Sequence, residues 1–242
     1  MKNNITSNKN ENPRETGGPG EKDPLTDIRL PLMILFLTAA TFTYVLELPQ
    51  WITLTVTAVF AATWAFFRES SLIFALLKNW RTSWTFVGPV AALFLYALLD
   101  MTIQTATSMV IDAGGLSQEN LPSLLSWLLS LRAAAGEMNP ILLGIGGGII
   151  LGIGEELFWR GFIQTRLMLI VSHGMAVLLT AVVYGVFYLF ILGPLAALLS
   201  LFLGIVLSML TLRSRSLIPG VLCHSVFLVL SLWLRPDITS FL

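Results

Sequence analysis

Long runs of apolar residues, each close to the length of a membrane-spanning helix, dominate this chain of 242 residues. A helix needs about 20 such residues to cross ~30 Å of hydrocarbon, and the shorter runs lie near the lower limit. None of the runs alternates in polarity with a period of two, as the strands of a membrane barrel would. The sequence therefore predicts an all-α, polytopic membrane bundle of about seven transmembrane helices. The predicted spans are Leu30–Leu46, Trp51–Phe67, Thr85–Ile111, Ile141–Leu157, Ala176–Leu192, Leu195–Leu212 and Leu217–Leu234.

Composition excludes several classes of soluble protein. Only 12% of the residues are charged, about half of what a soluble domain carries, and this argues against a soluble nucleic-acid binder, a coiled coil and a disordered chain. A formal net charge of +0 leaves no excess of positive charge for a polyanion-binding groove. The single cysteine, Cys223, excludes a disulfide framework and a thiolate metal cluster.

The ends of the chain differ from its apolar middle. Residues 1–29 are rich in Asn, Glu, Lys, Gly and Pro, which predicts a disordered cytoplasmic tail. The tail contains no apolar stretch before a cleavage site, so no cleavable signal peptide is expected. We expect N-terminal transmembrane helices and interfacial segments over 30–139, a core carrying the chemistry over 140–235, and a short tail over 236–242.

Two connecting segments have more than one interpretation. Arg68–Trp84 mixes apolar and basic residues and is either an interfacial amphipathic helix or a cytoplasmic loop with a basic flank. Leu121–Leu131 is apolar but too short to span, so we expect it to lie at the outer interface or to re-enter the membrane.

Basic residues gather at one set of predicted helix ends, whereas only Arg132 and Arg235 fall at the other. Cytoplasmic loops carry the excess of Lys and Arg in membrane proteins. This asymmetry predicts a cytoplasmic N-terminus, and we expect an integral protein of a bacterial inner membrane. The basic residues on the cytoplasmic side are Arg29, Arg68, Lys78, Arg81, Arg160, Arg166, Arg213 and Arg215.

Carboxylates beside the fourth predicted span are the first candidates for chemistry, because a charge inside a bilayer is costly and is functional by default. In GIGEELFWRGFIQ, Glu156 and Arg160 are four residues apart and can pair on one helix face. Glu155 points about 100° away, so it is left free to take a proton, as a general base must. The alternative is an ordinary charge cluster that caps the helix at the headgroups.

A tyrosine pair and a histidine are expected near Glu155. If the chain turns near Ser172, then Glu155 and Tyr188 are 17 and 16 residues from the turn and lie at similar depth. Tyr184 shares a helix face with Tyr188, and hydroxyls at that depth need partners such as the carboxylate; the alternative is an aromatic packing pair. His224 lies on the same side of the membrane, either as a packing residue or as part of the site.

Three further signals leave alternatives open. Gly144, Gly148 and Gly152 form a stripe that allows close helix approach, and a phosphate-binding loop is disfavoured because no GK[ST] follows. Asp100 either lines a cavity or is bonded to nearby hydroxyl groups, which we favour. A Cys223 nucleophile is disfavoured because its neighbour His224 points about 100° away on a helix.

The segments GEELFWRGFIQ, YGVFY and RSRSLIPGVLCHSVF together resemble the CAAX-protease and bacteriocin-processing (CPBP) family of glutamate-dependent intramembrane endopeptidases. The family pattern is EExxxR, FxxxH and HxxxN or HxxxD on three successive membrane elements. The resemblance covers about Ile141 to Leu234. It implies that a glutamate activates the attacking water, while histidines and an asparagine position the water or stabilise the oxyanion.

Transferred to this chain, the resemblance makes Glu155 the base, Glu156 its companion held by Arg160, and His224 the second histidine. Two of the three motifs depart from the pattern. The first motif histidine is Tyr188, preceded in the motif by Tyr184 in place of phenylalanine, and the motif asparagine is Leu228. Tyrosine can donate a hydrogen bond but is a poor zinc ligand.

We expect an intramembrane endopeptidase in which Glu155 activates water to attack a peptide bond of a membrane-associated, prenylated or peptide substrate. The alternative is a non-catalytic pseudoprotease that acts as a membrane scaffold or chaperone. A small transporter is a third class, which rests on Asp100 and the glycine-broken helix. The expected partners are the lipid bilayer and a peptide or lipidated protein, not nucleic acid. The sequence fixes no cofactor; a divalent metal such as zinc is the candidate that the resemblance offers.

Overall fold

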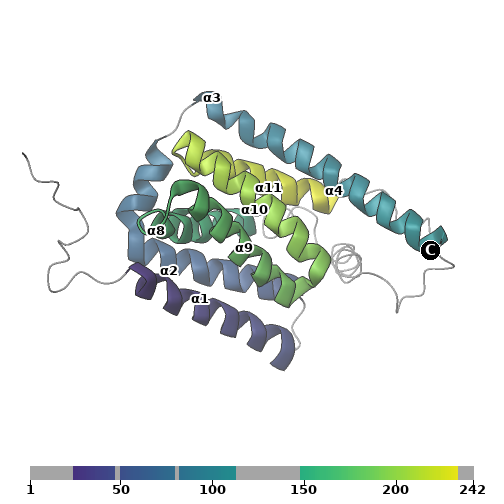
Figure 1. Cartoon of the computed structure of the whole chain (residues 1–242), viewed down its shortest axis with the longest axis horizontal. Helices are drawn as coiled ribbons and strands as arrows, with labels where there is room; N and C mark the ends of the chain where they lie inside the picture. The colour runs from purple at the N-terminus through teal and green to yellow at the C-terminus, as the bar shows by residue number, and fades with distance from the viewer. Residues whose placement is uncertain (1–23, 47–49, 80–81, 113–147, 234–242) are drawn as a thin grey trace, which may run out of the picture.

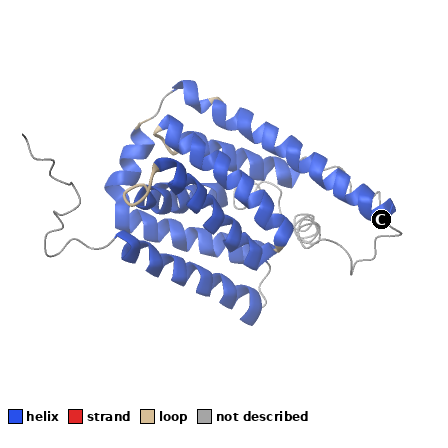
Figure 2. Ribbon diagram, viewed as in Figure 1, coloured by secondary structure: helices blue, strands red, loops and turns tan. Residues whose placement is uncertain are grey.

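The computed structural model describes residues 24–46, 50–79, 82–112 and 148–233, and the regular structure of these residues is helical throughout (Figures 1 and 2). The predicted all-α membrane bundle is confirmed. Most of the predicted N-terminal tail, the segment Leu121–Leu131 and Gly144 lie outside the described residues.

The described helices follow the predicted spans in order. Four of them are long and apolar enough to cross a membrane, namely α1 with its extension, α2, α9 and α10, and shorter apolar stretches lie within α4 and α11. The elements are α1 (Pro24–Ala40), the π-helix η1 (Thr41–Val45), α2 (Gln50–Lys78), α3 (Thr82–Thr85), α4 (Val87–Asp112), α7 (Leu151–Glu156), the π-helix η4 (Leu157–Gln164), α8 (Thr165–Leu167), α9 (His173–Leu192), α10 (Pro194–Ser214) and α11 (Ile218–Trp233).

The rod formed by α7, η4 and α8 lies in the middle of the bundle. It packs against α2, α9, α10 and α11, while α1 lies alongside α2 and α4 alongside α11 (Figure 1). α9 and α10 form a helical hairpin whose turn is Gly193, with a φ of 86° that suits glycine, followed by Pro194 at the start of α10. Seven of the eight residues of η4, Phe158 to Gln164, are therefore buried against other helices.

The turn that the sequence placed near Ser172 is confirmed. Ser172 has an extended backbone and caps α9, with its hydroxyl accepting a hydrogen bond from the N–H of Met175 at 3.4 Å. The apolar run of the fourth span ends at Leu157, but the helix continues through η4 and α8 to Leu167, as the count from a turn near Ser172 requires. Hydropathy ends the span where the charges begin, but in the folded chain those charges are paired inside the bundle and the helix does not stop.

α1 also begins earlier than predicted, at Pro24 rather than after Arg29. Proline is favourable in the first turn of a helix, and Asp27 is held by Arg68 at 2.8 Å and by Arg166 at 3.6 Å. Arg166 also pairs with Glu69. This ion cluster ties together α1, α2 and α8, and it orders a segment whose composition alone indicates disorder.

The segment after Arg68 is helical through Lys78, which overturns the loop interpretation for this part of Arg68–Trp84. α2 kinks at Glu69, where φ is −135° and ψ is 32°. In Figure 1 the helix changes direction toward α3. The kink coincides with the ion cluster, so the part of α2 beyond Glu69 runs along one end of the bundle.

The glycine stripe allows close helix approach, as predicted, at Gly148 and Gly152, the two members that the structure describes. A Cβ atom on Gly152 would lie 2.7 Å from Ser225 Oγ and 3.0 Å from Ser225 N on α11, and one on Gly148 would lie 2.5 Å from Val229 Cγ2. Because the obstacle at Gly152 includes backbone, α7 and α11 approach this closely only without side chains there.

We expect Gly152→Val to lower the thermal unfolding temperature in detergent, since overpacking a tight interface costs about 1–3 kcal/mol. Gly174→Val is the matched control, because nothing lies within 4 Å of a Cβ atom at that position. Equal unfolding temperatures for the two variants would show that α7 and α11 do not pack as described.

Candidate active site

The acidic pair and its arginine lie inside the bundle. Glu155 is 3% exposed, and Glu156 and Arg160 are both 0% exposed. The headgroup-cap interpretation of this cluster is therefore wrong, and so is the placement of Arg160 among the basic residues at helix ends. The sequence could not distinguish the two cases, because the burial comes from helices far away in the chain.

Glu156 is the centre of a buried polar network. Its Oε1 accepts a hydrogen bond from Arg160 Nη1 at 2.7 Å, the predicted i,i+4 pair, and lies 3.0 Å from His224 Nδ1. Arg160 also donates through Nη2 to the carbonyl of Gly204 at 3.4 Å. Gly220 lets α11 approach this carboxylate, because a Cβ atom there would lie 2.9 Å from Glu156 Oε2 and would displace it. Three helical segments, α7, η4 and α11, thus meet at one carboxylate, and Arg160 connects it to α10.

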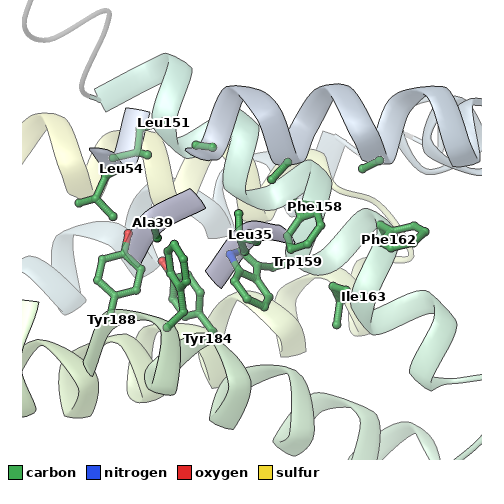
Figure 3. Close-up of a cluster of buried hydrophobic side chains, with 14 of the residues drawn as sticks. Leu35, Ala39, Leu54, Leu151, Phe158, Trp159, Phe162, Ile163, Tyr184 and Tyr188 are labelled. Atoms are coloured by element: carbon green, nitrogen blue, oxygen red, sulfur yellow. The ribbon is translucent and has the colours of Figure 1, made fainter. Parts of the chain in front are cut away.

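Glu155 is held by the two tyrosines of α9. Tyr184 donates to Oε2 at 2.5 Å and Tyr188 donates to Oε1 at 2.6 Å. The predicted contact between the carboxylate and this helix face is present, and the tyrosines are more than a packing pair. In Figure 3 both hydroxyls point away from α9, on the side where Leu54 and Leu151 lie.

Aromatic packing fixes the orientation of the tyrosines. The ring centroids of Tyr184 and Tyr188 are 5.0 Å apart, and Trp159 lies 5.4 Å from Tyr184 in an edge-on arrangement (Figure 3). The guanidinium carbon of Arg160 lies 4.8 Å from the Tyr184 ring centroid, within cation–π range. Trp159 and Arg160 are next to each other on η4, so this one helix supports both the tyrosine and the neighbouring carboxylate.

His224 lies between the two glutamates. Its Nδ1 faces Glu156 at 3.0 Å, and its Nε2 lies 3.7 Å from Glu155 Oε2. The ring is 1% exposed. Because Glu156 fixes one ring nitrogen, the other is directed toward Glu155, so an imidazole nitrogen and a carboxylate oxygen face each other.

A pocket opens beside this group. Its polar lining includes Tyr184, Tyr188 and His224, and most of the remaining wall is apolar. Leu228, which occupies the position of the motif asparagine, lines the pocket one helical turn from His224. Both departures from the family pattern, Tyr188 and Leu228, therefore face the same space.

The other sequence candidates are not among the residues that line this pocket. His173 is the exposed first residue of α9, at the turn. Cys223 is buried in a second apolar cluster with Ala92 and Leu207, as its divergence from His224 predicted. Asp100 lies half-buried on α4.

Sequence reasoning missed Gly204 and Gly220. Both lie in apolar spans, where a glycine in the sequence indicates no partner. The Gly204 carbonyl accepts a hydrogen bond from Arg160, and the absent side chain of Gly220 leaves room for the Glu156 carboxylate. Gly220 follows a proline in IPG near the start of α11, which indicates a helix start but not a contact with Glu156.

The donor set does not fit a zinc ion. Among the residues that the structure describes, no three of His, Cys, Asp and Glu form a group arranged to hold a metal. A catalytic zinc site uses three protein ligands of these types, whereas here Tyr188 stands at a motif position and Oε1 of Glu156 is engaged by Arg160 and His224.

Comparison with known proteins supports the resemblance that the motifs indicated. Residues 137–230 match the sequence model of the family described as type II CAAX prenyl endopeptidase Rce1-like. The matched segment contains α7, η4, α8, α9 and α10, most of α11, and every member of the buried polar group. Neither the comparison with curated proteins nor the comparison with solved structures found a match.

Proposed function

We propose that this protein is an intramembrane endopeptidase of the CPBP type, in which Glu155 activates water. The observation that supports this most directly is the position of Glu155. It is a buried carboxylate held by two tyrosine hydroxyls, 3.7 Å from a histidine nitrogen and next to an apolar pocket. A buried acid with fixed partners at the edge of a pocket is the arrangement that general-base catalysis requires.

In the proposed reaction a water molecule binds between Glu155 and Nε2 of His224. Glu155 takes one proton from this water as the oxygen attacks the scissile carbonyl carbon, and later delivers that proton to the leaving amine. Tyr188 shifts its hydrogen bond from Glu155 to the developing oxyanion. Glu156 and Arg160 act as positioning residues, since they hold the imidazole of His224 from behind.

The pocket indicates the class of substrate. Its wall is formed mainly by leucines and other apolar residues from α2, α4, α7, α9, α10 and α11. Such a space suits an apolar side chain or the lipid group of a membrane-associated peptide placed beside the scissile bond. We propose a peptide or lipidated protein as substrate, processed within a bacterial inner membrane.

The proposal is tested with the full-length protein reconstituted in phospholipid vesicles. A farnesylated peptide and the same peptide without the farnesyl group are incubated with the vesicles, and released fragments are identified by mass spectrometry. We expect a defined cut near the lipidated residue, in the farnesylated peptide only. If both peptides are cut at equal rates, the protein does not recognise the lipid group. If neither peptide is cut, lipidated peptides are not its substrates.

Tyr188 gives a sharper test of the site. Tyr188→Phe keeps the ring that packs on Tyr184 but removes the hydroxyl, and losing one oxyanion donor costs about 10²–10³ in turnover. We expect a loss of that size, read as initial rate on the peptide that the parent cuts. Tyr44→Phe is the matched control, because that hydroxyl donates to the carbonyl of Phe190, outside the group around Glu155. Equal rates for Tyr188→Phe and the parent would exclude the oxyanion role.

A second candidate function is a non-catalytic scaffold or chaperone that binds membrane helices or tails in the pocket. Two observations favour it: hydroxyl groups occupy both oxygens of Glu155, and an apolar Leu228 lines the pocket at the motif asparagine position. This candidate predicts an inactive parent that gains peptidase activity in the double variant Tyr188→His and Leu228→Asn. Turnover by the parent protein would exclude it.

A further inference from the structure

A second pocket lies between α1 and α2, and the proposed chemistry does not use it. The α2 residues that line it include Phe60, Trp64 and Arg68. The remaining lining residues are Asp27, Leu30, Pro31, Thr63 and Phe67.

Polarity changes in one direction along this pocket. Phe60, Trp64 and Arg68 are spaced four residues apart on α2, so they lie on one helix face with about 6 Å of helix between successive positions. The centroids of the Phe60 and Trp64 rings are 6.4 Å apart. The series begins with the apolar ring of Phe60 and ends with the guanidinium of Arg68. A glycerophospholipid has the same order, with acyl chains first, then ester groups, then a phosphate.

The charged end of the pocket carries both signs. Arg68 is 42% exposed and uses Nη2 to reach Asp27 at 2.8 Å, which leaves other N–H donors of the guanidinium for a second acceptor. Asp27 is shared with Arg166, which also pairs with Glu69. The cluster therefore has two arginines and two carboxylates and no excess charge, which is complementary to a zwitterionic headgroup rather than an anionic one.

Trp64 supplies the middle contact. Its indole N–H is shielded from water and has no hydrogen-bond partner among the described parts of the chain. An unsatisfied indole N–H is costly, and tryptophan is enriched at the depth where lipid headgroups meet acyl chains. When the phosphate of a phospholipid binds Arg68, its ester carbonyl groups lie about one helical turn deeper. This is the depth of the Trp64 N–H.

We propose that the groove between α1 and α2 binds one zwitterionic aminophospholipid of the phosphatidylethanolamine type. The phosphate is bonded to Arg68, in the bidentate manner that guanidinium groups favour. The ammonium group lies near Asp27, an ester carbonyl accepts from Trp64, and an acyl chain packs along Leu30, Pro31 and Phe60.

Native mass spectrometry of the full-length protein tests this proposal. The delipidated protein is mixed in detergent with phosphatidylethanolamine, phosphatidylglycerol or diacylglycerol that carry identical acyl chains. We expect one retained phosphatidylethanolamine per chain, with at least tenfold weaker retention of diacylglycerol, which lacks the phosphate. Equal retention of phosphatidylglycerol would overturn the headgroup assignment, and retention of many lipids without a preferred stoichiometry would overturn the site.

Three variants locate the lipid. Arg68→Gln is expected to reduce retention at least tenfold. Trp64→Phe is expected to reduce it by a smaller factor, because it removes the indole N–H but keeps an aromatic ring. Lys78→Gln, which removes an exposed charge from the same helix outside the pocket, is the control. Because Arg68→Gln also breaks the contact with Asp27, its unfolding temperature is measured in parallel. Unchanged retention in both Arg68→Gln and Trp64→Phe would contradict the proposal.

Discussion

Replacing Glu155 with glutamine is expected to reduce peptide-bond cleavage by about 10²–10⁴, the range that a positioned general base contributes. Glutamine is nearly the same size as glutamate and can still bond one tyrosine, but it cannot accept the proton from water. The measurement is the initial rate on the peptide that the reconstituted parent cuts, together with the unfolding temperature to show that the fold is kept.

The matched control is Glu69→Gln. This carboxylate belongs to the ion cluster and pairs with Arg166, away from the group around Glu155. Its loss is expected to leave turnover unchanged. If Glu155→Gln and Glu69→Gln had equal rates, the base would have to be another residue.

Replacing Arg160 with methionine is expected to destabilise the protein by about 3–5 kcal/mol, because it leaves the buried Glu156 carboxylate without its cation. Arg160 Nη1 lies 2.7 Å from Glu156 Oε1, and both side chains are 0% exposed. Thermal or denaturant unfolding in detergent measures the loss. Arg213→Met, which removes an exposed arginine near the end of α10, is the control and should change the free energy of unfolding by less than about 0.5 kcal/mol.

The double variant Glu156→Gln with Arg160→Met distinguishes a buried charge pair from ordinary packing. Removing both charges takes away the desolvation cost as well as the attraction, so the double variant should recover most of the stability lost in Arg160→Met. Additive losses in the double variant would show that the two side chains do not interact as a pair.

Simple geometry was enough to predict the central contact of the site. Counting residues on either side of a turn at Ser172 placed Glu155 and Tyr188 at one depth, and the i,i+4 rule added Tyr184 to the same face. The structure contains both hydrogen bonds. This works because helix rise and helix periodicity are fixed by the backbone, so depth follows from residue number once a turn is known.

Burial and long-range partners could not be predicted in the same way. Local composition places Arg160 at a helix end, yet it is enclosed by η4, α9 and α10 and bonded to the carbonyl of Gly204. The early start of α1 has the same cause, because Asp27 is ordered by arginines from other helices.

The most direct test of the central claim is terminal-peptide mapping of membrane proteins in three strains: the parent, a deletion, and a chromosomal Glu155→Ala variant. If the protein is a peptidase, Glu155→Ala and the deletion accumulate the same uncleaved precursor, which also identifies the substrate. If Glu155→Ala matches the parent while the deletion differs, the protein acts by binding and the proposed chemistry is contradicted.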